Sequence, residues 1–199
     1  AGLLPSDNLL LLKKENNVVT VEFGTDDIIQ EIVNTLGVLP EPIDKDANGI
    51  LLVEGKGDIH FFDHISTELK NGGFITHSLS EKKVVIIPIG GCGSLKHWVT
   101  LKIADKFGLP YAIIIDSDLG TPEEPRNRQQ IYDLVTQGKK AFCTNKREPE
   151  NYLDSSLIIS TNGQPIVYTA TDDAKKIISA ATGTKETLVL ETYVKLMNH

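Results

Sequence analysis

The sequence of 199 residues has few cysteines and no long apolar run. Its two cysteines, Cys92 and Cys143, form no CxxC motif and have no Cys/His spacing suited to zinc, so neither a zinc finger nor a disulfide framework is expected. No apolar stretch approaches the roughly 20 residues that a membrane-spanning helix requires. The first residues also lack the basic start and apolar stretch of a signal peptide. These absences predict a cytoplasmic protein with no membrane partner.

An excess of positive charge is also missing. The 20 Lys and Arg residues are outnumbered by 27 Asp and Glu residues, and the formal net charge is -7. Proteins that coat nucleic acid by bulk electrostatics usually have a basic face, so the composition argues against that mode of binding. An enzyme acting on nucleic acid is still allowed, because carboxylates that hold divalent cations add negative charge themselves.

The order of apolar and helical patterns predicts an α/β fold. Apolar runs of strand length occur at 50–53, 84–89, 111–115 and 141–144, and helical patterns occur at 58–69, 94–107 and 126–136. Strands that alternate with helices form a parallel sheet covered on both faces. Two further helices are predicted at 172–181 and 185–196, with Gly183 between them as a helix stop.

The first 48 residues show a different pattern. Apolar runs at 9–12 and 18–23 flank a polar bend, which predicts a β-hairpin. Thr25 is a candidate N-cap for a helix that ends at Gly37, and a polar stretch containing two prolines follows. We therefore expect an N-terminal appendage at 1–48 and an α/β domain at 49–199.

Polar residues follow three of the predicted strands, where ligands of open parallel sheets bind. They are Glu54 and Asp58 after the first strand, Gly90, Gly91, Gly93 and Ser94 after the second, and Asp116 and Asp118 after the third. Glycines at 55 and 57 allow a sharp turn, so Glu54 and Asp58 can face one cleft. The alternation of an extended chain would direct Asp116 and Asp118 to the same side.

Four converging carboxylates repel one another, and a hard divalent cation relieves that repulsion. A site with oxygen ligands alone favours magnesium, manganese or calcium over zinc. Each motif is weaker when taken alone, since Asp58 is equally well explained as a helix cap. The glycine turn at 90–94 precedes a predicted helix and could hold a phosphate of a substrate, or could be a tight turn only.

These motifs together resemble the Toprim domain of topoisomerases, primases and small nucleases. The matching stretches are 51–58, 89–91 and 113–118, and the resemblance extends over about 50–196. Within that group, the Glu150-Asn151-Tyr152-Leu153 stretch and a late helix bearing Lys175 and Lys176 resemble the nucleases of the OLD (overcoming lysogenization defect) family. The segment 3–8 before the hairpin resembles the tail of an ABC-type ATPase domain.

The resemblance implies a Toprim (Rossmann-like) parallel sheet and a divalent-metal-dependent DNA endonuclease that uses two Mg²⁺ or Mn²⁺ ions. It implies that Asp116 and Asp118 hold one metal, that Glu54 and Asp58 complete or share it, and that Glu150 reaches a second. Lys176, or alternatively Lys175, would stabilise charge in the transition state. It also implies DNA as substrate, an ATPase domain in the same full-length chain and a role in phage defence, and it leaves a homodimer open.

Two other interpretations fit parts of the sequence. The strand followed by Asp116-Ser117-Asp118 also resembles haloacid-dehalogenase-like phosphatases, in which the first aspartate is a nucleophile. Against this, Thr121 falls one position late for that family, and the motif lies in the middle of the chain instead of at its start. A non-catalytic Toprim interaction module is the second alternative. OLD proteins often have Glu where this sequence has Asp58, and this departure concerns the spacing of the metal ligands.

Overall fold

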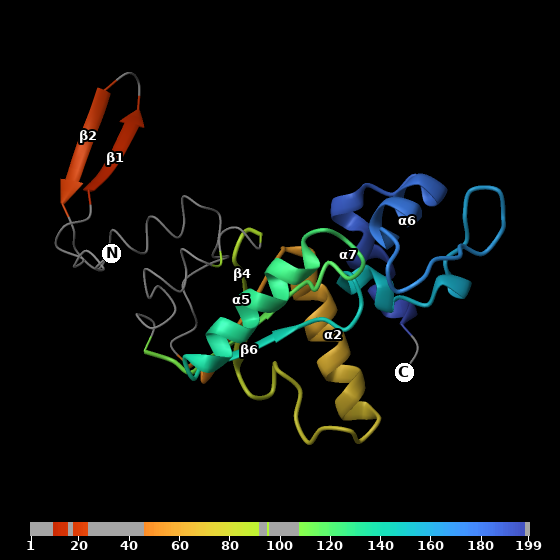
Figure 1. Ribbon diagram of the computed structural model, residues 1–199, viewed down its shortest axis with the longest axis horizontal. Helices are drawn as coiled ribbons and strands as arrows, with labels where there is room; N and C mark the ends of the chain where they lie inside the picture. Colours follow the sequence, from red (N-terminus) through yellow and green to blue (C-terminus); the bar gives the residue numbers. More distant parts are fainter. Residues whose placement is uncertain (1–9, 16–17, 24–45, 92–94, 96–107, 198–199) are drawn as a thin grey trace.

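The computed structural model describes residues 10–15, 18–23, 46–91, 95 and 108–197 (Figure 1). Strands β1 (Leu10–Glu15) and β2 (Val18–Phe23) pair antiparallel in a hairpin, which confirms the prediction for this segment. The helices predicted at 25–37 and 94–107, together with Gly93 and Ser94, lie outside the described residues.

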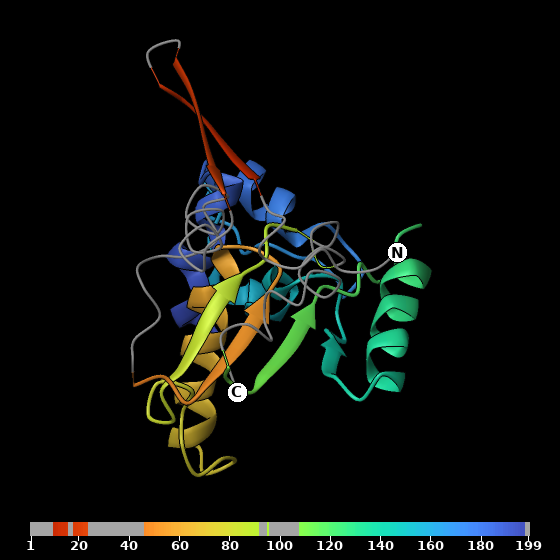
Figure 2. The same cartoon turned by 90° about the vertical axis from the view of Figure 1, so that its left-hand side faces the viewer.

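The central element is a parallel sheet of four strands (Figure 2). Its strands are β3 (Gly49–Val53), β4 (Val84–Pro88), β5 (Tyr111–Ile115) and β6 (Lys140–Cys143), arranged in the order β4-β3-β5-β6. The four strands lie within two residues of the apolar runs in the sequence, and the parallel α/β fold is as predicted. Because β3 and β5 are neighbours, their carboxyl ends lie side by side at one edge of the sheet.

Helices cover both faces of this sheet. Alternate residues of the strands, including Ile50, Leu52 and Ile113, form a buried core with Leu134 of α5 (Glu124–Thr136). The opposite face, which carries Leu51, lies against α2 (Gly57–Asn71), and the two line a common apolar pocket. None of the helices in the described part of the chain is long and apolar enough to cross a membrane.

A second buried core joins α2 to the C-terminal elements. Its buried residues are Phe61, Leu153, Ile158, Ile166, Ile178, Val189 and Leu190. The elements are the 3₁₀ turns η2 (Pro149–Tyr152) and η3 (Ser155–Leu157), helix α6 (Ala174–Thr182), and η4 (Glu186–Leu188), α7 (Val189–Tyr193) and η5 (Val194–Leu196). In Figure 1 they form the cyan-to-blue part of the molecule, to the right of α2. This core fixes α6 beside the sheet edge at which β3 and β5 end.

The prediction of a single helix at 185–196 is wrong, because the segment forms the three short helical pieces η4, α7 and η5. The backbone departs from regular helix at Leu188 and again at Tyr193. Val189, Leu190 and Val194 are buried against α2 and the second core, and this packing outweighs the local preference for one continuous helix. The predicted stop at Gly183 is confirmed, since Gly183 ends α6 in the left-handed conformation, at φ 75°.

Candidate active site

The first two candidate residues follow directly from neighbouring strands. Glu54 comes after β3 and Asp116 comes after β5, and the backbone N–H of Asp116 donates a hydrogen bond of 3.2 Å to Glu54 Oε2. This contact connects positions 62 residues apart in the chain. The parallel order of β3 and β5 therefore brings the two motifs together, as expected for a site at the carboxyl edge of the sheet.

Asp58 lies in the first turn of α2, behind the glycine turn. Its Oδ2 accepts a hydrogen bond of 2.8 Å from the backbone N–H of Gly55, and its side chain is buried. Burial raises the pKa of Asp58 to about 6, and the charge of Glu54 adds to the rise, while the bond from Gly55 opposes it. The raised pKa of Asp58 therefore reflects both its burial and the nearby charge of Glu54.

Glu150 enters this site from the 3₁₀ turn η2. It is 2% exposed, and its Oε1 lies 3.3 Å from Lys175 Nζ. Among the described residues, no group donates a hydrogen bond to its buried Oε2. Burial raises the pKa of Glu150 to about 7, and the positive charge of Lys175 only partly offsets that rise.

Asp116 lies close enough to three other carboxylates for their charges to affect its pKa. Burial is the main reason that its pKa lies well above the usual value, and the charges of Asp58, Glu54 and Glu150 raise it further. Lys175 acts in the opposite direction. We call Glu54, Asp58, Asp116 and Glu150 the acidic cluster.

Asp118 is directed elsewhere. Its backbone has φ 52°, in the left-handed region, so the alternation of an extended chain that would align it with Asp116 does not apply. Its Oδ2 accepts a hydrogen bond of 2.7 Å from Nδ2 of Asn127, a fully buried residue of α5. Asn127 Nδ2 also donates to the carbonyl oxygen of Asp116, at 3.2 Å. The structure therefore turns the Asp118 carboxylate towards α5.

The two candidate lysines occupy different environments although they are adjacent. Lys175 Nζ lies 3.3 Å from carboxylate oxygens of both Glu148 and Glu150. Burial lowers the pKa of Lys175, but the two glutamates outweigh it and hold the pKa above its usual value. Lys176 has a side chain that is 68% exposed and pairs with Asp173, at 3.0 Å. The structure thus brings Lys175, and not Lys176, to the acidic cluster.

The first turn of α6 determines that Lys175, and not Lys176, faces the acidic cluster. Asp173 caps the helix by accepting a hydrogen bond from the backbone N–H of Lys176, at 3.1 Å. Ala174 and Ile178 are fully buried, so they set the inward face of the helix. Glu148 accepts a hydrogen bond of 3.0 Å from the backbone N–H of Lys175, which holds this turn against η2.

The glycine turn after β4, where a phosphate site is predicted, contacts the end of β3 through the backbone of Gly91. Gly90 and Gly91 have φ values of 80° and 97°, which glycine adopts without strain. The backbone N–H of Gly91 donates to the carbonyl oxygen of Glu54, at 2.9 Å. That donor supports the turn that carries Glu54 and is already engaged, so it is not available for a phosphate.

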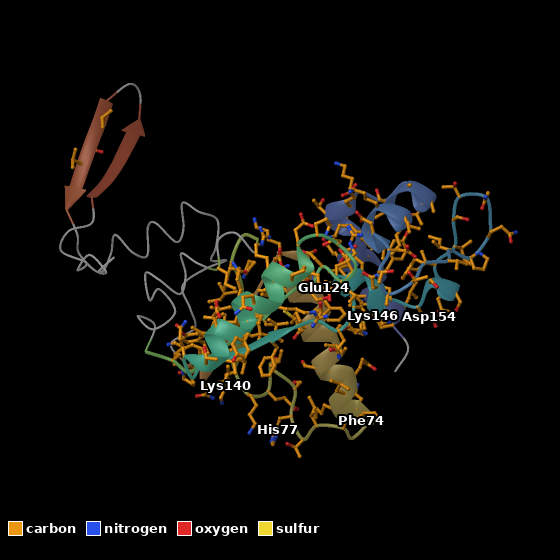
Figure 3. The ribbon with its side chains drawn as sticks, in the orientation of Figure 1. Phe74, His77, Glu124, Lys140, Lys146 and Asp154 are labelled. Carbon is orange, nitrogen blue, oxygen red and sulfur yellow. The ribbon has the colours of Figure 1, made fainter. Side chains whose placement is uncertain are left out.

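Residues beyond the predicted set position the site. Asn151 is buried, and its Nδ2 donates to the carbonyl oxygens of Thr169 and Asp172, at 2.7 and 3.0 Å. Its Oδ1 accepts from the backbone N–H of Glu148, at 3.1 Å, so Asn151 connects η2 to the chain that enters α6. Lys146 donates to the carbonyl oxygen of Asn151, at 2.9 Å, and lies where the loop after β6 approaches these elements (Figure 3). Asn151 belongs to a stretch that the sequence singled out, but the sequence did not indicate that its side chain positions the site.

The donor set suits a hard divalent cation. All four members of the acidic cluster offer carboxylate oxygens, and Glu150 Oε2 is a buried acceptor without a hydrogen-bond donor among the described residues. Within that same part of the chain, no three Asp, Glu, His or Cys side chains converge closely enough to hold a metal ion. Glu54 and Asp58 each accept a backbone hydrogen bond, and Glu150 pairs with Lys175. The ligands are therefore near one another but engaged with groups of the protein.

A pocket of about 620 Å³ opens beside the cluster. Asp58, Glu150 and Lys175 line it together with the glycine turn at 55–57 and residues 186–188 of η4. Lys56 also lines this pocket and is exposed. The pocket gives solvent and ligands access to the carboxylates from the side of α6 and η4.

Comparison with known proteins gives one family. Residues 47–118 match the family model described as "Overcoming lysogenization defect protein-like, TOPRIM domain". The match spans β3, α2, β4, β5 and the Asp116-Ser117-Asp118 motif. The comparison with curated proteins gave no match. The four-stranded parallel sheet agrees with the matched family, and residues 47–118 are therefore similar to an OLD-like Toprim domain.

Proposed function

We propose that this protein is a divalent-metal-dependent endonuclease that hydrolyses phosphodiester bonds in DNA. The observation that carries the proposal is the acidic cluster with Lys175 at the carboxyl edge of an OLD-like Toprim sheet. Toprim domains are typically metal-dependent nucleases or primases, so the coarse class follows from the family. The hydrolysis of DNA, and the use of two ions, are the finer steps that we propose.

The carboxylates would hold the cations. Glu54 and Asp116 are joined through the Asp116 N–H and would form one part of the site, with Asp58 beside them. Glu150 would serve a second position through its Oε2, to which no described residue donates a hydrogen bond. Divalent cations, when bound, supply Lewis-acid stabilisation of charge on the phosphoryl oxygens.

The remaining groups orient the site and stabilise charge. Lys175 would stabilise negative charge that develops on the reacting phosphate, because its ammonium group lies beside the cluster and faces the pocket. Asn127 and Asn151 hold the segments that carry Asp116 and Glu150. Asp118 supports the loop after β5, because its Oδ2 accepts a hydrogen bond from Asn127.

The phosphatase alternative is less well supported by the geometry. In a phosphatase of that kind the second aspartate of the motif acts as an acid beside the nucleophile. Here the second aspartate, Asp118, accepts a hydrogen bond from Asn127 of α5. This arrangement gives the phosphatase less support than the acidic cluster gives the nuclease.

The test is cleavage of supercoiled plasmid DNA by the purified protein with Mg²⁺, with Mn²⁺ or with EDTA. We expect nicked or linear DNA in both metals and none in EDTA, with 5′-phosphate and 3′-hydroxyl ends. Hydrolysis of p-nitrophenyl phosphate that requires Asp116, without any plasmid cleavage, would instead establish the phosphatase. Adding the ATPase domain that we expect in the full-length chain tests whether that partner controls access to DNA.

A further inference from the structure

The acidic cluster already contains one positive charge. Lys175 acts electrostatically on Asp58, Asp116 and Glu150 alike, although these residues come from three separate segments of the chain. Its Nζ is placed by two carboxylates, with 3.3 Å to Glu148 Oε2 and 3.3 Å to Glu150 Oε1. The lysine thus supplies a positive charge that partly offsets the burial and mutual repulsion of these carboxylates.

We propose that Lys175 acts as a resident counter-cation at Glu150, and that a divalent cation binding Glu150 displaces its ammonium group into the adjoining pocket. The inference rests on the proposed function, since it concerns the same metal site. It adds a coupling that the Toprim fold does not itself imply. Occupation of Glu150 by the ammonium group and by a metal ion would be mutually exclusive.

The contacts of Glu150 support this exclusion. An ion that binds a carboxylate approaches its oxygens to about 2.0–2.6 Å, and the Lys175 ammonium already lies against Oε1. Oε2, which has no donor among the described residues, is the point at which a second cation can first bind. Two cations on one carboxylate repel each other strongly in a buried site, so the monovalent one is expelled.

The surroundings of Lys175 allow its side chain to move while its helix stays in place. The backbone N–H of Lys175 is held by Glu148 Oε1, at 3.0 Å, and α6 is anchored by the buried Ala174 and Ile178. The pocket of about 620 Å³ has Lys175 in its wall together with Asp58 and Glu150. A displaced ammonium group would therefore remain at the mouth of the site, where the phosphate of a substrate would enter.

A Mn²⁺ titration of the full chain at pH 8 tests the inference without any nuclease assay. Electron paramagnetic resonance measures the free Mn²⁺ and so gives the amount bound. The central variant is Lys175→Met, which removes the charge and keeps an unbranched apolar chain. Lys176→Met is the matched control, because Lys176 is the adjacent lysine of the same helix and pairs with Asp173. Lys175→Arg keeps the charge and controls for local loosening of the fold.

We expect Lys175→Met to bind Mn²⁺ roughly tenfold more tightly than the wild type, since a like charge a few ångströms from the ion is removed. Lys176→Met and Lys175→Arg should bind like the wild type. If Lys175→Met does not fold in EDTA, Mn²⁺ should restore the folded protein, because the metal supplies the missing counter-charge. If the wild type binds Mn²⁺ too weakly for its affinity to be measured, tight binding by Lys175→Met would also support the inference.

Three results would overturn the inference, and they differ in what else they refute. Wild-type binding that depends on Glu54 but is not strengthened by Lys175→Met would refute the displacement and leave the proposed function standing. The absence of Mn²⁺ binding in every protein, Lys175→Met included, would refute the displacement together with the metal site of the proposed function. An unfolded Lys175→Met protein that Mn²⁺ does not refold would also count against the displacement.

Discussion

Neutralising Glu150 should stabilise the metal-free protein. Glu150 is 2% exposed, and one of its oxygens is buried without a hydrogen-bond donor among the described residues. Its ionised form is therefore costly even with Lys175 beside it. Glu150→Gln keeps the shape of the side chain and removes the charge, so we expect the variant to be more stable than the wild type above neutral pH in EDTA.

The magnitude follows from the pKa of Glu150, which rises from 4.5 to about 7 on folding. Each pKa unit corresponds to about 1.4 kcal/mol, so the ionised carboxyl lowers the free energy of unfolding by about 3 kcal/mol at pH 8. Because the folded pKa lies above the unfolded value, the wild type is favoured below about pH 4.5 and loses stability as the pH rises through 7. Glu150→Gln should lack this decline.

The assay is thermal or urea unfolding of both proteins in EDTA at pH 5 and at pH 8. A gain of about 3 kcal/mol corresponds to roughly 5–10 °C in Tm for a chain of this size. The difference should be small at pH 5, where the folded wild type is largely protonated at Glu150. Adding Mg²⁺ at pH 8 should raise the Tm of the wild type and have less effect on Glu150→Gln.

Equal or lower stability of Glu150→Gln at pH 8 in EDTA would refute the reasoning. It would mean that the ion pair with Lys175 outweighs the burial of the carboxylate. A difference between the two proteins that is as large at pH 5 as at pH 8 would also refute it, because the effect would then not arise from ionisation.

The other predictions concern Lys175 and the two buried asparagines. Lys175→Met should lower the single-turnover rate of DNA cleavage by roughly 100-fold or more, whereas Lys176→Met should stay within about twofold of the wild type, and equal losses would contradict the assignment. Asn151→Ala removes three hydrogen bonds of a buried amide, so urea unfolding should show a free energy of unfolding lower by about 2–4 kcal/mol. A loss below about 1 kcal/mol would show that Asn151 does not hold the connection between η2 and α6. Asn127→Ala leaves the Asp118 carboxylate without its amide donor and should cost about 2–3 kcal/mol by the same measurement, while Asn127→Ala with Asp118→Ala should recover part of that loss.

The sheet and its edge could be predicted because they depend on local patterns. Apolar runs identified all four parallel strands, and the rule that ligands bind at the carboxyl edge placed Glu54 near Asp116. The two positions are 62 residues apart, yet neighbouring parallel strands leave little freedom in where their ends meet. The sequence was informative here because strand period and topology determine the geometry.

The sequence could not determine details that depend on tertiary contacts. Asp118 departs from the expected alternation because its backbone turns to φ 52° and its side chain meets Asn127 of α5. The choice between Lys175 and Lys176 depends on the cap at Asp173, since a shift of one residue turns a side chain by about 100° around a helix. The segment 185–196 has a helical pattern, but its packing against α2 divides it into three pieces.

The central claim is that the acidic cluster cleaves DNA with the help of a divalent cation. The most direct test compares plasmid cleavage in Mg²⁺ by the wild type, Glu54→Gln and Asp116→Asn, with Asp154→Asn as a control for a carboxylate in the loop before η3. The account predicts cleavage by the wild type and the control, and loss of at least about 100-fold in both cluster variants. Cleavage that persists in Glu54→Gln and Asp116→Asn, or that continues in EDTA, would contradict it.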